Sequence, residues 1–188
     1  MVQQNITLIS FGYFEESFLK EIAAAVKKEY SSVVRIKEGH LDLSEFFDPT
    51  RRQYNGTRLL KEVDQLFSTD EAKTIGLFSV DLFIPILTYI FGQAMLSGRT
   101  GVASHYRLNN ERYGMPADPA LLISRFEKEV IHELGHTFGL VHCHTPSCVM
   151  RSSTYAEDID QKETGLCRNC QLKLDTLTDV ESIKPKQI

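Results

Sequence analysis

The chain of 188 residues lacks the surplus of positive charge that is typical of proteins binding nucleic acids or anionic membranes. Its formal net charge is −4 and its isoelectric point is about 5.9. Its most apolar stretch, residues 82–96, is too short and too interrupted by polar residues, glycine and proline to span a membrane. The first residues, MVQQNITLISFGYF, have neither the basic region nor the long apolar region of a signal peptide. We therefore expect a soluble, cytoplasmic protein with no nucleic-acid and no membrane partner.

The length fits a single domain, residues 1–188, with a substantial buried core, and we expect a monomer. Strand and helix patterns alternate along the first half of the chain. The β-branched and apolar patterns predict strands at residues 5–11, 33–36 and 75–80, and helices at 15–30 and 57–67. Residues 39–56 show no clear period and are predicted to form a long loop of unknown role.

Two further strands, at residues 89–94 and 101–107, flank the turn-like sequence Ser97-Gly98-Arg99. Their closeness predicts an antiparallel hairpin at one side of the sheet, which would leave an edge strand available. Together these elements indicate an α+β fold with an α/β-like first half.

The next predicted helix begins at Asp118, a good N-cap, followed by Pro119 at the first helical position. An apolar residue then recurs every four positions, which gives a stripe that can pack on the sheet. The stripe consists of Leu122, Phe126, Val130, Leu134 and Phe138. Towards the end of this helix and just beyond it the chain reads HELGHTFGLVHC, residues 132–143.

The spacing of the histidines is the strongest chemical signal in the sequence. His132 and His136 are four residues apart and lie one above the other on a helix, so both imidazoles can reach one ion. Gly139 lies where the helix should end, and its turn lets His142 return as a third ligand. Three imidazoles leave the fourth position of zinc for water, whose pKa the ion lowers towards about 7. Glu133 is then the candidate base.

The alternative is that these histidines are surface or core residues without a metal. A lone histidine favours that interpretation, but three histidines at this spacing, with the glutamate and the glycine, do not. His144 has the wrong spacing for a third ligand and is assigned no role.

The four cysteines form a second pattern. Cys143 and Cys148 are followed by Cys167 and Cys170 in the sequence CRNC, and together they supply a complete four-thiolate shell. A closed shell has no open position, so we expect a structural zinc. Two disulfides or four unrelated thiols are the alternatives, and a reducing compartment argues against disulfides. His142 and Cys143 are adjacent, and in an extended segment they would face different ions.

The sequence HELGHTFGLVHCHTPSCVM, with the later CRNC, resembles the archaemetzincin family of the metzincin clan of zinc metallopeptidases. The resemblance implies a metzincin (zincin) fold with a twisted mixed sheet, a backing helix and an active-site helix. It implies an upper subdomain, residues 1–139, and a small C-terminal subdomain, residues 140–188, with a cleft between them. Met150 would lie in the turn beneath the catalytic zinc.

By the same resemblance, His132, His136 and His142 bind a catalytic zinc, Glu133 is the general base, and the four cysteines bind a second, structural zinc. The implied function is hydrolysis of peptide bonds in a peptide or protein substrate, with two zinc ions per chain, and an aminopeptidase mode is one option. Some metzincins have a tyrosine two residues after the methionine, whereas this chain has Ser152 there, so no oxyanion stabiliser is assigned. The alternatives are a zinc-stabilised peptide-binding or regulatory module with little turnover, and a zinc hydrolase acting on another amide.

Overall fold

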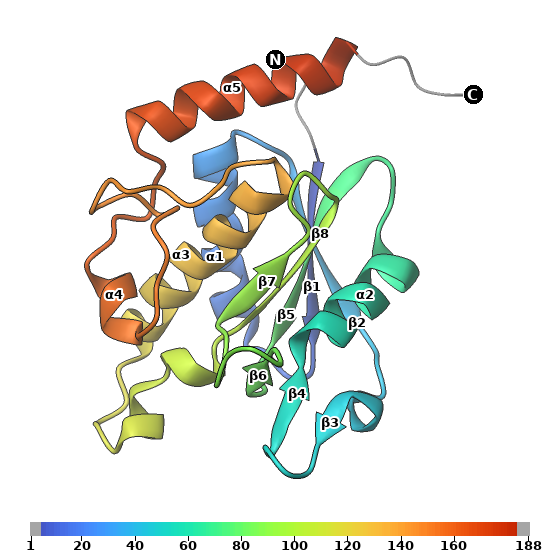
Figure 1. Ribbon diagram of the computed structural model, residues 1–188, viewed down its shortest axis with the longest axis vertical. Coiled ribbons are helices and arrows are strands. Elements are labelled where there is room, and N and C mark those ends of the chain that lie inside the picture. Colours follow the sequence, from blue (N-terminus) through green and yellow to red (C-terminus); the bar gives the residue numbers. More distant parts are fainter. Residues whose placement is uncertain (1–4, 184–188) are drawn as a thin grey trace.

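A five-stranded mixed sheet forms the centre of the protein, with the strand order β2-β1-β5-β8-β7 (Figure 1). The computed structural model describes residues 5–183, and side chains as far as residue 179. Three pairs of neighbouring strands are parallel, and β7 is antiparallel to β8 at one edge. The strands of this sheet are β1 (Asn5–Phe11), β2 (Val34–Gly39), β5 (Ala72–Phe78), β7 (Gly92–Ala94) and β8 (Thr100–Ser104).

Helices cover both faces of the sheet, α1 and α3 on one face and α2 on the other (Figure 1). The alternation of β1 explains the two layers, because Ile6 and Leu8 belong to one buried apolar cluster and Ile9 and Phe11 to another. The central strands β1 and β5 are buried almost throughout, as expected for strands covered on both sides. The three helices are α1 (Glu16–Tyr30), α2 (Gly56–Phe67) and α3 (Pro119–Thr137).

The strands and helices predicted in the first half of the chain are confirmed, with boundaries that shift by a few residues. The predicted hairpin is also confirmed, although both of its strands are shorter than expected. Strand β7 begins at Gly92, and the chain leaves β8 after Ser104 to form short 3₁₀ turns, η2 (Tyr106–Leu108) and η3 (Asn110–Tyr113). The mixed α+β architecture is therefore as predicted.

The prediction of a long loop at residues 39–56 is wrong. This segment contains the 3₁₀ turn η1 (Leu43–Phe46) and two short strands, β3 (Phe47–Asp48) and β4 (Gln53–Asn55). They form a second, three-stranded sheet with β6 (Leu82–Phe83), in the order β3-β4-β6. Strands of two or three residues are too short to show a period in the sequence, and they exist here because they pair with a distant strand.

After α3 the chain forms α4 (Ala156–Asp160) and α5 (Arg168–Ile183). Figure 1 shows α5 lying across one end of the molecule. Within the described residues, no helix is both long enough and apolar enough to cross a membrane.

Candidate metal centres

Helix α3 begins and ends where the sequence predicts. The carboxylate of Asp118 accepts a hydrogen bond from the backbone N–H of Leu121 at 2.9 Å, and Pro119 occupies the first turn. At the other end Gly139 has a φ of +96°, a conformation that residues with a side chain rarely adopt. The chain therefore turns back sharply and brings residues 140–143 beside the helix end.

The structure brings the three predicted histidines together. The Nε2 atoms of His132 and His136 are 3.0 Å apart, and ligand nitrogens of all three rings, including that of His142, lie within 4.8 Å of one another. With a metal–nitrogen distance of about 2.0–2.1 Å, tetrahedral zinc separates two ligand nitrogens by roughly 3.3 Å. The cluster therefore has close to the dimensions that one zinc ion requires.

Backbone carbonyls fix the tautomers of two of these rings. His132 Nδ1 donates to Val149 O at 2.8 Å, and His136 Nδ1 donates to Leu140 O at 2.7 Å. A neutral ring that donates through Nδ1 has a bare lone pair on Nε2. Two such lone pairs facing each other at 3.0 Å would repel, and a cation between them removes that repulsion.

Burial also favours the form of the rings that binds metal. It lowers the pKa of His132 well below its usual value, with a further lowering by His136 and Lys162. Burial likewise lowers the pKa values of His136 and His142. Since only neutral imidazole coordinates a metal, the site is prepared for an ion at neutral pH.

Glu133 lies beside the histidines and is buried, with 4% of its surface exposed. Within the described part of the chain, its Oε2 atom has no hydrogen-bond partner. Gly92 of β7 provides the space for this side chain, because a Cβ at that position would be 2.7 Å from Glu133 Cγ and 2.8 Å from Oε1. A buried, unsatisfied carboxylate oxygen at a cluster of metal-ligand nitrogens is what a general base beside a metal site requires.

Two charged residues near Glu133 were not singled out from the sequence. Glu129 lies one helical turn before it and is buried, and Lys162, which follows α4, is also buried. Burial raises the pKa of Glu133 well above its usual value, Glu129 raises it further, and Lys162 opposes this effect. Burial likewise raises the pKa of Glu129 to about 7. The position of Glu129 four residues before Glu133 was a usable signal, whereas Lys162 is brought in only by folding.

Met150 packs directly against Gly135 in helix α3. Met150 is fully buried, and a Cβ at position 135 would be 2.4 Å from its sulfur atom. The glycine inside α3, which weakens a helix by about 1 kcal/mol relative to alanine, is therefore needed for the close approach of the methionine. The carbonyl of the neighbouring Val149 accepts a hydrogen bond from His132, so this turn sets the position of the His132 ring.

The four cysteines also come together, as free thiols. The Sγ atoms of Cys143 and Cys167 are 3.8 Å apart, and so are those of Cys148 and Cys170. Tetrahedral zinc with Zn–S bonds of about 2.3 Å places its sulfurs roughly 3.8 Å apart. The backbone N–H of Thr145 points at Cys143 Sγ and that of Cys167 at Cys148 Sγ, both at 3.4 Å, which suits sulfur atoms that carry negative charge.

His142 and Cys143 belong to different clusters, as the sequence predicted. The backbone N–H of Cys143 donates to Met150 O at 2.9 Å, which ties this segment to the methionine turn. His144, which was assigned no role, is exposed and outside both clusters.

The histidine cluster opens into a cleft of about 670 Å³. One wall consists of residues 87–94 with Leu96, the other of residues 152–155, and His132, His136 and His142 line the space between them together with Glu133. The cysteine cluster does not line this cleft. The cleft is of a size that binds peptides or other small ligands.

Comparison with known proteins agrees with this geometry. The sequence model of peptidase family M54 matches residues 7–176. The archaemetzincin of Thermococcus kodakarensis is 39% identical over 176 residues, which cover 90% of this chain and 94% of that protein. The crystal structure of archaemetzincin from Methanopyrus kandleri superposes with a TM-score of 0.82 at 31% identity, covering 94% of this chain and 96% of the other. The archaemetzincin of Archaeoglobus fulgidus, solved with malonate, gives a TM-score of 0.75 at 30% identity, covering 90% and 99%.

The fold is thus that of a zinc metallopeptidase, and the three histidines form a group that could hold the metal. The chain belongs to the archaemetzincins, peptidase family M54.

Proposed function

We propose that the protein hydrolyses peptide bonds in the cleft, with Glu133 as general base and then general acid, and with His132, His136 and His142 as ligands of the catalytic zinc. The observation that carries the proposal is the unsatisfied Oε2 of Glu133, buried beside three converging imidazoles. Zinc at this site would polarise the substrate carbonyl and make water more acidic.

In this proposal Glu133 transfers protons, and two backbone carbonyls orient the histidine rings. Glu133 accepts a proton from the attacking water, and when the C–N bond breaks it delivers a proton to the leaving nitrogen. A divalent cation beside Glu133 would counteract the effect of burial and lower its pKa, so that the base is ionised when it is needed. Val149 and Leu140 keep the rings of His132 and His136 in the orientation that coordinates the metal.

We propose a second, structural zinc held by Cys143, Cys148, Cys167 and Cys170. Its support is the pair of 3.8 Å sulfur separations and the completeness of the four-ligand shell. This ion would join the segment that carries His142 to the start of α5. Within the predicted subdomain, residues 140–188, it would fix the part that the structure describes, residues 140–183, to the rest of the fold.

A zinc-stabilised module that binds peptides without cleaving them remains the second candidate. The same cleft and the same histidines would serve it, but it has no use for a buried carboxylate with an unsatisfied oxygen, which is costly to keep. Glu133 therefore favours the enzyme.

Digestion of a peptide library, read by mass spectrometry, separates the two candidates. Glu133→Gln preserves the size of the side chain and removes its ability to accept a proton, so cleavage should fall by about 10² to 10⁴-fold. Zinc content and peptide binding should be unchanged, because Glu133 is not a ligand. Equal cleavage by the two proteins would show that the activity belongs to other groups or to a contaminant.

A further inference from the structure

A hydrogen bond crosses the cleft at one end. The hydroxyl of Tyr89 donates to the backbone carbonyl of Thr154, 2.9 Å away on the opposite wall. Both residues line the cleft. The two walls, which belong to parts of the chain 65 residues apart, therefore touch at this point.

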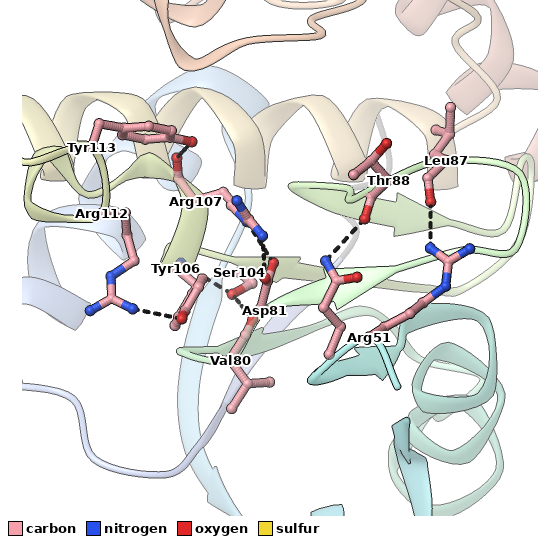
Figure 2. Close-up of polar contacts among 11 residues, drawn as sticks. Arg51, Val80, Asp81, Leu87, Thr88, Ser104, Tyr106, Arg107, Arg112 and Tyr113 are labelled. Atoms are coloured by element: carbon pink, nitrogen blue, oxygen red, sulfur yellow. Dashed lines mark hydrogen bonds and ion pairs between the residues drawn. The ribbon is translucent and has the colours of Figure 1, made fainter. Parts of the chain in front are cut away.

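The ring of Tyr89 packs against the ion pair of Arg107 and Asp81. The guanidinium carbon of Arg107 lies 4.8 Å from the centre of the Tyr89 ring. Arg107 itself makes two hydrogen bonds, of 2.8 and 2.5 Å, to the carboxylate of Asp81, which is 7% exposed (Figure 2). A two-pronged bond of this kind fixes both the position and the plane of the guanidinium group. The ring of Tyr89 therefore packs on a guanidinium group that is itself fixed in position.

The backbone just before Tyr89 is held by hydrogen bonds from the segment at residues 39–56, whose role the sequence left open. Arg51 donates to the carbonyl of Leu87 at 3.1 Å (Figure 2), and the side chain of Gln53 donates to the carbonyl of Thr88 at 3.0 Å. Residues 47–55 therefore support the outer side of this cleft wall.

The opposite wall is fixed as well. One carboxylate oxygen of Asp158 accepts hydrogen bonds from the backbone N–H groups of Thr154 and Tyr155, at 2.8 and 2.9 Å. The bond between Tyr89 and Thr154 consequently joins two anchored walls, and neither wall can move aside without breaking other bonds.

The position of Tyr89 relative to Glu133 determines how many peptide residues fit between them. Gly92 packs on Glu133, and Tyr89 lies three residues before it on the same wall. An extended peptide advances about 3.3 Å per residue, so a peptide lying alongside these three residues of the wall covers them with two or three residues of its own. At the other end, Leu96 and Val141 line the cleft and are more than half exposed.

The direction of the peptide follows from the edge strand. Because β7 is an edge strand with unpaired backbone groups, a bound peptide can pair with it, and antiparallel pairing is the more stable kind per residue. A peptide antiparallel to β7 has its C-terminal part directed towards the beginning of that strand, where Tyr89 lies.

We propose that Tyr89 is a specificity-determining residue that limits the substrate to about two or three residues on the C-terminal side of the cleaved bond. On the N-terminal side the open end admits a long chain. The protein would then release short fragments from the C-terminus of a peptide and would not cut in the middle of a chain. This inference rests on the proposed peptidase function.

Ligands that are anchored at zinc test the limit without requiring turnover. Two series of peptide hydroxamates are used with zinc-loaded protein, and their affinities are measured by calorimetry. In one series the hydroxamate is at the amino end, so the peptide extends towards Tyr89; in the other it is at the carboxyl end, so the peptide extends towards Leu96. Each series increases from one residue to six.

Towards Tyr89, we expect affinity to rise over the first two or three residues and then to fall by at least about two- to tenfold, the net value of the hydrogen bond that must break. Towards Leu96 no such fall is expected. Tyr89→Phe, which keeps the ring, should reduce the loss, and Tyr89→Ala should abolish it.

Tyr113→Phe is the matched control. The hydroxyl of Tyr113 also donates to a backbone carbonyl, that of Arg107, at 2.9 Å, but the residue lies outside the cleft. This variant should retain the length dependence of the wild type and show whether the loss of one tyrosine hydrogen bond in this region is sufficient to disturb the wall.

The proposal is overturned if both series depend on length in the same way, if the fall occurs only towards Leu96, if neither series binds, or if the Tyr89 variants behave like wild type. Failure of the peptidase function is a separate result, the absence of hydrolysis that depends on Glu133. The two failures are distinguishable because binding of hydroxamates does not need the base.

Discussion

The histidine cluster and the cysteine cluster begin at adjacent residues, yet they differ in two respects. His132, His136 and His142 offer three ligand atoms and line a cleft, whereas the cysteines offer four ligand atoms and lie away from it. Cys148 and Cys170 are part of the largest apolar core, together with residues of β1, β5 and α3. A site with three ligands and access to solvent leaves a position for chemistry, and a site with four ligands inside the core leaves none. Access to the cleft and the number of ligand atoms therefore distinguish the proposed catalytic site from the proposed structural site.

The largest expected effect comes from removing one ligand at each site. Cys170→Ser should prevent stable folding, because a structural zinc contributes on the order of 10 kcal/mol and a domain of this size is stable by about 5–15 kcal/mol. His136→Ala should give a folded protein that has lost one zinc. Circular dichroism during heating and elemental analysis measure both properties. A Cys170→Ser protein as stable as wild type would contradict the structural role of the cysteine site.

A chelator should remove zinc from the histidine site before it removes zinc from the cysteine site. The histidine site has one protein ligand fewer and is open to solvent, so a chelator should remove its zinc first, and activity should be lost while the fold persists. Removal of the second zinc should coincide with unfolding. Zinc release, peptide cleavage and ellipticity are followed in the same sample, and addition of zinc after the first step should restore cleavage. Simultaneous loss of all three signals would mean that the two sites are not distinct in this way.

Gly92→Ala tests whether activity depends on the position of Glu133 as well as on bound zinc. The added methyl group would overlap Glu133 and also approach the backbone oxygen of Val102 to 2.8 Å. It should displace the Glu133 carboxylate, and a shift of about 1 Å in a catalytic group can reduce the rate by roughly 10²-fold. Zinc content should not change. The control is Gly76→Ala, which introduces a crowded methyl group in β5, against Phe78 at 3.0 Å and Phe11 at 3.2 Å, away from the cleft. If both variants lose the same activity, general strain in the sheet explains the result and the contact with Glu133 does not.

The smallest effect concerns the pH dependence of kcat/KM. Burial raises the pKa of Glu133, and the positive charge of Lys162 lowers it, so Lys162→Gln should raise it further. A general base acts in its ionised form and loses activity as the pH falls through its pKa; the acid limb of the profile should therefore move to higher pH.

Lys128→Gln is the matched control for this effect. Lys128 is also buried and donates to a backbone carbonyl, that of Ile159, but its charge is not among the groups that shift the pKa of Glu133. An unchanged acid limb in Lys162→Gln, or an equal shift in the control, would exclude Lys162 as the group that tunes the base.

Much of the histidine site could be predicted from the sequence because its determinants are local. The i, i+4 spacing of His132 and His136 fixes their relative position on any helix, Asp118 and Pro119 fix where the helix begins, and Gly139 fixes the turn after it. The CxxC sequence is similarly local. Each of these patterns restricts dihedral angles and distances within a few residues, whatever surrounds them.

The tertiary structure decided the features that join distant parts of the chain. Lys162 lies close enough to lower the pKa of Glu133, Gly92 leaves space for the Glu133 side chain, and Tyr89 donates a hydrogen bond to Thr154. These contacts exist only because the sheet, α3 and the C-terminal segment pack together. The segment at residues 39–56 acquired its short strands in the same way, by pairing β4 with β6. Such contacts depend on where the whole chain buries its apolar surface, and no period or spacing within a short stretch of sequence records that.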